Sequence, residues 1–139
     1  MASIEKYTAG QVSYMLRHNS RETPKPPSNI DIDPTRSALN YTLAPERGTT
    51  ARACKNYYND RLNAVYHMNR SDIITAAQWV ITAPKDLAAD QEERFFRETF
   101  NYLNSLYGEK NCIQCVVHYD EGVKGNDGQI IAGRSHLHY

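Results

Sequence analysis

Cys112-Ile113-Gln114-Cys115-Val116-Val117-His118-Tyr119 is a run of residues typical of a β-strand, and it ends where the chain becomes polar. A second stretch near the end of the chain, Ser135-His136-Leu137-His138, places two histidines one position apart. In a β-strand, residues i and i+2 project from the same face, so both histidines would point to one side while Leu137 points to the other. We therefore predict two strands that are antiparallel neighbours in one sheet.

Three histidines on these two strands form the strongest candidate site. If the strands pair, His118 joins His136 and His138 around one point. Three neutral imidazoles bind divalent transition metals and leave positions open for water or substrate, as catalysis requires. The alternative is that these are surface histidines near a terminus that bind nothing. We expect a catalytic metal site with His118, His136 and His138 as its ligands.

Apolar periodicity, capping residues and turn signals outline the rest of the fold. The order of elements fits an α+β architecture, with an antiparallel β-sheet and helices packed on one face. The proline-rich stretch 23–28 must form a loop or an extended strap. We expect strands at 3–6, 38–43, 77–82 and 112–119, helices at about 8–16, 49–68 and 90–106, and a small hairpin that pairs 123–124 with 129–131 around Gly125-Asn126-Asp127-Gly128.

Length and composition indicate one soluble domain covering residues 1–139. The chain has neither a long apolar run nor a signal-like start, so we expect a cytoplasmic location and no membrane contact by this domain. Its three cysteines are odd in number, which favours buried, reduced thiols.

Charge is balanced over the whole chain but unevenly placed. Sixteen basic and sixteen acidic side chains give a formal net charge of zero, which argues against indiscriminate binding to nucleic acid. Ten tyrosines offer flat surfaces on which unpaired bases can stack, although most tyrosines serve packing. The basic side chains gather in the first quarter: Arg17, His18, Arg21, Lys25 and Arg36.

Four blocks of sequence, in this order, resemble the catalytic domain of the MobV class of plasmid mobilization relaxases, also called Pre/Mob plasmid recombination proteins, of the HUH endonuclease superfamily. The resemblance covers nearly the whole chain, and it rests on the combination of blocks rather than on any one of them. The blocks are Leu16-Arg17-His18-Asn19-Ser20-Arg21, Asn29-Ile30-Asp31 with Pro34-Thr35-Arg36-Ser37-Ala38-Leu39-Asn40-Tyr41, Trp79-Val80-Ile81-Thr82, and His118-Tyr119-Asp120-Glu121 with His136-Leu137-His138.

The resemblance implies an HUH relaxase-like fold and a DNA-nicking enzyme. Such an enzyme cuts one strand at a plasmid transfer origin and becomes joined to the 5′-phosphate. The nucleophile would be His18, a reasonable role for a neutral imidazole near pH 7. Mn²⁺ or Mg²⁺ would be the metal, and Glu121 or Asp120 would orient a ligand or accept a proton.

The resemblance also implies contacts with single-stranded or hairpin DNA at the origin. Arginines contact phosphates, while amide and phenol groups position the strand or the nucleophile. The candidates are Arg17, Asn19, Arg21, Arg36, Asn40 and Tyr41.

The chain departs from the family pattern in two places. Thirteen residues separate Glu121 from Ser135, where the family has only a few, and a surface hairpin can absorb such an insertion at small entropic cost. The family domain continues with a further strand and helix after the paired histidines, so we expect a catalytic domain truncated at its C-terminus.

Three other functions stay open at this point. A rolling-circle replication initiator or transposase would use a tyrosine nucleophile such as Tyr14 or Tyr58. A non-catalytic remnant would bind DNA or metal without cutting. An unrelated tris-histidine hydrolase would act on small molecules, and the four blocks argue against it.

Overall fold

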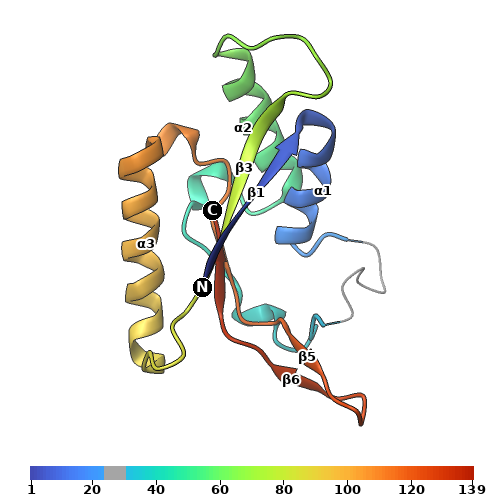
Figure 1. The fold of residues 1–139 in the computed structure, drawn as a ribbon, viewed down its shortest axis with the longest axis vertical. Coiled ribbons are helices and arrows are strands. Elements are labelled where there is room, and N and C mark those ends of the chain that lie inside the picture. Colours follow the sequence, from blue (N-terminus) through green and yellow to red (C-terminus); the bar gives the residue numbers. More distant parts are fainter. Residues whose placement is uncertain (24–30) are drawn as a thin grey trace.

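A five-stranded antiparallel sheet forms the centre of the computed structural model, which describes residues 1–23 and 31–139 (Figure 1). Its strand order is β1-β3-β7-β4-β2, and every neighbouring pair runs antiparallel. A separate two-stranded hairpin, β5-β6, projects from the body of the molecule. The strands are β1 (Ala2–Thr8), β2 (Tyr41–Thr42), β3 (Ile74–Thr82), β4 (Val116–His118), β5 (Gly122–Lys124), β6 (Ile130–Ala132) and β7 (His136–His138).

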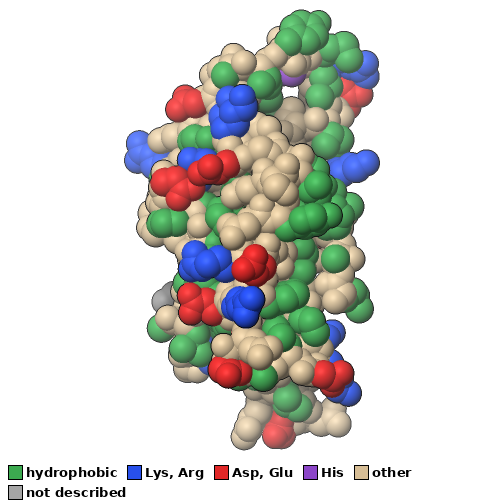
Figure 2. Space-filling view, turned by 90° about the vertical axis from the view of Figure 1, so that its left-hand side faces the viewer, with side chains coloured by type: hydrophobic (Ala, Val, Ile, Leu, Met, Phe, Trp, Pro, Cys, Tyr) green, Lys and Arg blue, Asp and Glu red, His purple; other side chains and the backbone are tan. Residues whose placement is uncertain are grey.

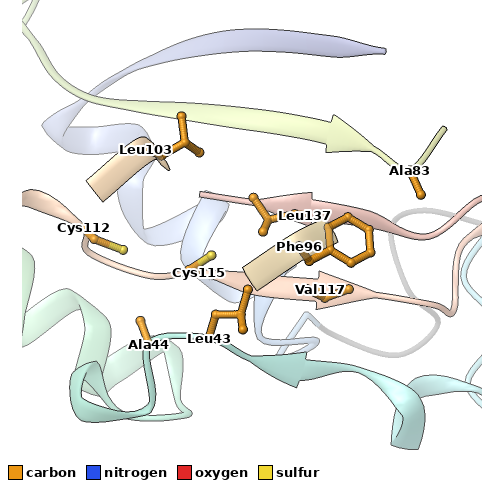
Figure 3. Packing of buried hydrophobic residues seen from close by; sticks show 9 residues of the cluster. All are labelled: Leu43, Ala44, Ala83, Phe96, Leu103, Cys112, Cys115, Val117 and Leu137. Carbon is orange, nitrogen blue, oxygen red and sulfur yellow. The ribbon is translucent and has the colours of Figure 1, made fainter. Parts of the chain in front are cut away.

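Helices cover both faces of the sheet. α1 (Ala9–Asn19) and α2 (Ala51–Asn63) pack together around Leu16 and Cys54 on one face. On the other face, Phe96 of α3 (Glu92–Tyr107) belongs to the same core as Leu137 of β7 (Figure 3). Four short 3-10 turns complete the described elements, at Ser37–Leu39, Pro45–Arg47, Ala89–Gln91 and Glu109–Asn111.

The α+β class and the antiparallel sheet are thus confirmed, but the helices cover both faces of the sheet rather than the one face expected from the sequence. The reason lies in β7, the middle strand. Its Leu137 is fully buried toward α3, while the histidines on either side of it point toward α1. Both faces of this strand are buried, so each needs a cover.

Local signals explain where the helices begin and end. The Gln11 side chain accepts a hydrogen bond from the Thr8 amide at the start of α1, and Thr50 Oγ1 accepts one from the Ala53 amide at the start of α2. α3 ends at Tyr107, and the capping residue Gly108 has a φ of 85°, which suits glycine. The outer side of α3 mixes both signs of charge (Figure 2), including an ion pair between Arg97 and Glu93.

Several predicted elements differ in extent from the structure, among them the following. α2 ends at Asn63 rather than near Met68. Residues 38–43 form a 3-10 turn and a two-residue strand instead of one long strand. Only Val116–His118 of the stretch 112–119 pairs as a strand. The proline-rich loop predicted at 23–28 lies outside the described residues, apart from Thr23.

The predicted hairpin is confirmed, and its base is tightly held. Val123 pairs with Ile131, and the amide of Gly125 donates to the carbonyl of Gln129 at the turn. At the base, the Gly133 amide donates to the Glu121 carbonyl over 2.9 Å. A Cβ atom on Gly122 would lie 2.2 Å from the Ile131 carbonyl oxygen, so only glycine fits there.

Among the described residues, none of the helices has the length and apolar character needed to cross a membrane.

Candidate active site

The central position of β7 brings the three predicted histidines together. His136 lies opposite His118 on β4, and His138 lies two pairs further along, opposite Val116. Because residues i and i+2 share a face, both β7 histidines project to the same side as His118. The three ring centroids are 4.7 to 5.5 Å apart. The predicted juxtaposition of the three rings is therefore present.

Glu121 completes a cluster of four potential metal ligands. One side-chain donor atom from each of Glu121, His118, His136 and His138 lies within 4.8 Å of the others. The Glu121 carboxylate is 3.4 Å from His136 Nε2 through Oε2 and 3.9 Å from His118 Nδ1 through Oε1. The family resemblance implies that Glu121 accepts a proton or orients a ligand. Its position in the cluster makes it a possible metal ligand as well.

Backbone carbonyls set the protonation of two of the rings. His118 Nε2 lies 2.9 Å from the Asn19 carbonyl, which can only accept, so this nitrogen carries the proton and Nδ1 keeps a lone pair. Likewise, His136 Nδ1 faces the Arg134 carbonyl at 3.3 Å, which leaves Nε2 with its lone pair toward Glu121. Such outer hydrogen bonds are what orients metal-bound histidines.

Three ring nitrogens of the cluster are buried and lack hydrogen-bond partners in the described residues. His118 Nδ1 and both ring nitrogens of His138 have no hydrogen-bond partner, although buried polar atoms are nearly always paired. The donors are imidazoles and a carboxylate, which suit Mn²⁺ and related divalent ions. The cluster therefore fits a divalent metal, held by His118, His136, His138 and Glu121.

Burial keeps His118 and His138 neutral, the state in which an imidazole can bind a metal. It lowers the pKa of His118 to about 3, helped by the positive charge of Arg21. Burial also holds the pKa of His138 well below its ordinary value, and the neighbouring histidines lower it further. Neutral imidazoles at pH 7 have lone pairs ready for a cation.

His18 stands beside this cluster at the end of α1. Its Nε2 lies 3.6 Å from Glu121 Oε1, and its ring centroid is 6.2 Å from that of His138. Burial alone would raise the pKa of Glu121, but the neighbouring His18, His136 and Arg21 side chains bring it well below its usual range. The carboxylate is therefore ionised and lies between His18 and the three clustered histidines.

Asp120 serves as an anchor next to the cluster. Its carboxylate is fully buried and accepts from Arg21 Nε and Nη2, Ser37 Oγ and Asn40 Nδ2, at 2.6 to 3.0 Å. Burial would raise its pKa, but these hydrogen bonds and the Arg21 charge lower it to about 2. These hydrogen bonds connect the end of α1 and the turn at residues 37–40 to the end of β4.

Arg21 spans both acidic residues. It donates to Asp120 and, over 2.8 Å, to Glu121 Oε1. Its backbone φ of 56° lies in the left-handed region, which is rare for residues other than glycine. The ion pairs of Arg21 with Asp120 and Glu121 offset the energetic cost of this backbone conformation.

The other predicted DNA-binding residues fall into two groups. Asn19 and Asn40 are occupied inside the protein: Asn19 is buried and donates to Gln78 and Gln114, and Asn40 holds Asp120. Tyr41 also packs inside, against the core between the sheet and α3, on the face opposite the histidines. The second group is Arg17, which is exposed, and Arg36, which is half-buried.

The alternative tyrosine nucleophiles lie outside the cluster. Tyr58 is buried between α1 and α2, where its hydroxyl is 2.6 Å from that of Thr75. Tyr14 is exposed on α1. Gln78 and Gln114, which hold Asn19, were missed by the sequence analysis because single glutamines carry no motif.

Comparison with known proteins gives consistent matches. A family model described as plasmid recombination enzyme, Mob_Pre, matches residues 1–139. The plasmid recombination enzyme of Streptococcus agalactiae is 35% identical over an alignment of 130 residues with gaps, which covers 87% of this chain and 25% of that protein. The type 1 enzyme of Staphylococcus aureus is 32% identical over an alignment of 118 residues with gaps, which covers 77% of this chain and 27% of that protein. The chain thus spans about a quarter of the length of these relatives.

Solved structures show the same fold. Two are Mn-bound MobM relaxase domains (MOBV; Mob_Pre) in complex with plasmid pMV158 oriT DNA. One aligns with a TM-score of 0.76 at 30% identity and the other with 0.74 at 31%. Both alignments cover 99% of this chain and 67% of the other.

Proposed function

This chain belongs to the Mob_Pre family of plasmid recombination enzymes, and from this we propose that it is a metal-dependent DNA relaxase. It would nick one strand at a plasmid transfer origin and become joined to the 5′-phosphate through His18. The observation that carries the proposal is the Glu121 carboxylate, which lies beside His18 on one side and three lone-pair-bearing histidines on the other.

His18 is suited to be the nucleophile. A proton on the ring nitrogen beside Glu121 leaves the lone pair of the other nitrogen free to attack phosphorus, without a base to deprotonate it. In the joining step a nitrogen–phosphorus bond forms, the bond from phosphorus to the 3′-oxygen breaks, and that oxygen takes up a proton to become a 3′-hydroxyl. Glu121 would hold the ring in place and balance the positive charge that the attack creates on it.

A divalent ion in the His118, His136, His138 and Glu121 cluster would polarise the scissile phosphate and stabilise charge on the leaving oxygen. We take Mn²⁺ or Mg²⁺ as the ion, since the MobM relaxase domains are Mn-bound. Arg21 and Asp120 would fix the position of Glu121 between His18 and this cluster.

Single-stranded or hairpin origin DNA is the proposed substrate, because the MobM domains of similar fold are bound to oriT DNA. Arg17 and Arg36 are the proposed phosphate contacts, as neither has a side-chain ion pair among the described residues. Asn19, Arg21 and Asn40 would act by positioning the site, since their side chains are held inside the protein.

The test is intact-protein mass spectrometry after incubation with a pool of single-stranded origin-like oligonucleotides and Mn²⁺. A mass increase that needs metal, disappears in His18→Ala and is lost in acid would support the proposal, because a phosphohistidine bond hydrolyses in acid. An acid-stable adduct retained in His18→Ala would assign a tyrosine instead. Oligonucleotide binding with no adduct for any pool member would favour a binding module.

A further inference from the structure

Two apolar side chains lie exposed beside each other on the β5–β6 hairpin. Val123 of β5 pairs with Ile131 of β6, and the two residues are 67% and 66% exposed. Single exposed apolar residues are common on protein surfaces and need no explanation. This apolar pair stands on a ribbon that projects from the body of the molecule (Figure 1), where it can contact another molecule.

Strand periodicity places the apolar pair on the same face as the Glu121 carboxylate. Glu121 is bridged to Ile32 on one side, and its carbonyl accepts from the Gly133 amide on the other, so the extended backbone of β5 continues back to Glu121. Residues i and i+2 of a strand share a face, so Val123 projects to the side to which Glu121 points. At about 3.3 Å per residue, the apolar pair lies roughly 7 Å beyond Glu121 along the strand.

The hairpin is held in place at its base. The Gly122 amide donates to the Asp31 carbonyl over 2.9 Å, and the Asp33 amide donates to the Asp120 carbonyl over 2.7 Å. Ile32, between these two bonds, is buried. A two-stranded hairpin alone is only marginally stable in water, so these contacts support its extended form. The apolar pair is therefore presented at a set distance from the metal-ligand cluster.

The charges of the hairpin are compatible with a nucleic acid. Lys124 and Arg134 are exposed, and Asp127, at the tip, is the only acidic side chain of residues 122–134. On β5 no acidic side chain stands between the apolar pair and Glu121. A phosphate backbone that reaches the cluster would therefore meet little repulsion along the hairpin.

We propose that Val123 and Ile131 form an apolar wedge that packs against one unpaired base of the DNA strand, within two nucleotides of the scissile phosphate. The inference rests on the proposed function, in which that phosphate lies at the metal-ligand cluster. The distance of roughly 7 Å corresponds to two stacked base steps of about 3.4 Å. Apolar side chains such as isoleucine are used by DNA-binding proteins as wedges that separate neighbouring bases.

The wedge would position the strand for cutting. A base held at a set distance from the cluster determines which phosphodiester bond lies beside His18, so Val123 and Ile131 would act as positioning residues. Apolar contact with the face of a base does not read its hydrogen-bonding groups. The wedge would therefore accept different bases at its position and leave sequence recognition to other parts of the protein.

The test is a double-mutant cycle between protein and DNA that needs binding but no cleavage. The member of the origin-like oligonucleotide pool that binds most tightly is synthesised with one abasic nucleotide, which is moved along the strand one position at a time. Fluorescence anisotropy gives the affinity of each strand for the wild type, for Val123→Thr/Ile131→Thr and for the control Val65→Thr/Ile74→Thr. Both variants replace one exposed valine and one exposed isoleucine, and threonine keeps the branched shape.

One abasic position should lower the affinity of the wild type and of the control variant by about fivefold or more, because a stacked base is lost there. In Val123→Thr/Ile131→Thr the loss at that position should shrink to less than about twofold, with the other positions unchanged. Mn²⁺ affinity by titration calorimetry should stay within about twofold in this variant, since Glu121 keeps its place. Where an adduct forms, the contacted base should lie within two nucleotides of the joined phosphate.

The same abasic profile in the two double variants would overturn the proposal. A uniform loss of affinity at every position would do so too, as would a contacted base further from the joined phosphate. Self-association of the wild type that disappears only in Val123→Thr/Ile131→Thr would assign the apolar pair to a second copy of this chain instead. A position-specific loss that depends on the wedge, without an adduct in any protein, would support the wedge and count against the proposed function, so the two can fail separately.

Discussion

His18 Nε2 lies 3.6 Å from Glu121 Oε1, which links the end of α1 to the turn that follows β4. The same carboxylate also lies 3.4 Å from His136 Nε2. One acidic side chain therefore couples the proposed nucleophile to the proposed metal ligands. Because the link is made by side chains on separate elements, each partner can be removed singly.

Replacing His18 with alanine should abolish the covalent adduct and leave oligonucleotide affinity within about twofold. The ring supplies the attacking nitrogen but little of the binding surface, since phosphate contacts provide most of the affinity for DNA. Mass spectrometry and fluorescence anisotropy measure the two quantities. His67→Ala, at an exposed position, is the matched control. Full adduct formation in His18→Ala would rule out the histidine nucleophile.

Replacing His136 with alanine should weaken Mn²⁺ binding by more than about 100-fold. Loss of a residue that only hydrogen-bonds to a metal ligand costs roughly 10–100-fold in metal affinity, and loss of a ligand itself should cost more. Calorimetric titration of the purified protein reads this without any DNA. His67→Ala should bind as the wild type does. An unchanged affinity in His136→Ala would show that the cluster is not the metal site.

Replacing Asp120 with asparagine should lower the free energy of unfolding by on the order of 3 kcal/mol, because Arg21 loses its buried partner and the hydrogen bonds from Ser37 and Asn40 are disturbed. Urea denaturation at pH 7 measures the change. Asp86→Asn, an exposed site, should change stability by less than about 0.5 kcal/mol. Similar effects of the two substitutions would contradict the anchoring role.

Metal-free protein should lose stability as the pH falls from about 6.5 toward 3. The pKa of His118 is lowered to about 3, so in that window the unfolded chain takes up a proton that the folded chain refuses. The slope is up to about 1.4 kcal/mol per pH unit for such a group. Below pH 4 the contribution of Asp120, whose pKa is about 2, is lost in addition.

Urea denaturation in the presence of a chelator, repeated between pH 7.5 and 4, tests this dependence. His118→Phe removes one of two such groups, because the pKa of His138 is also lowered by burial, so the slope in the upper part of the window should decrease without vanishing. An unchanged slope in that variant would assign the pH dependence to other groups.

Much of the site could be predicted because strand periodicity is short and strict. Two histidines at i and i+2 share a face in any strand, and His118 falls within another predicted strand, 112–119. The roles of Asn19 and Arg21 could not be predicted in this way. Their partners Gln78, Gln114 and Asp120 come from distant parts of the chain, and no local pattern shows that an asparagine or arginine points inward.

The extent of the strands was harder to predict than their existence. Residues 112–115 have strand-forming side chains, but pairing needs a neighbour, and β7 ends level with Val116. α2 stops at Asn63 because the residues that follow are exposed and gain no packing from helical structure. Tertiary context decided both cases.

The β5–β6 hairpin has a practical consequence. The hydrogen bond from Gly133 to Glu121 closes the base of the hairpin. Glu121 and the strand with His136 and His138 therefore keep their relative positions when the tip of the hairpin changes. Doubling the length of a closed loop costs only about 0.6 kcal/mol. The tip around Asn126 is therefore a natural attachment point for a fluorophore or an affinity tag, by which protein on DNA can be followed without touching the chemistry.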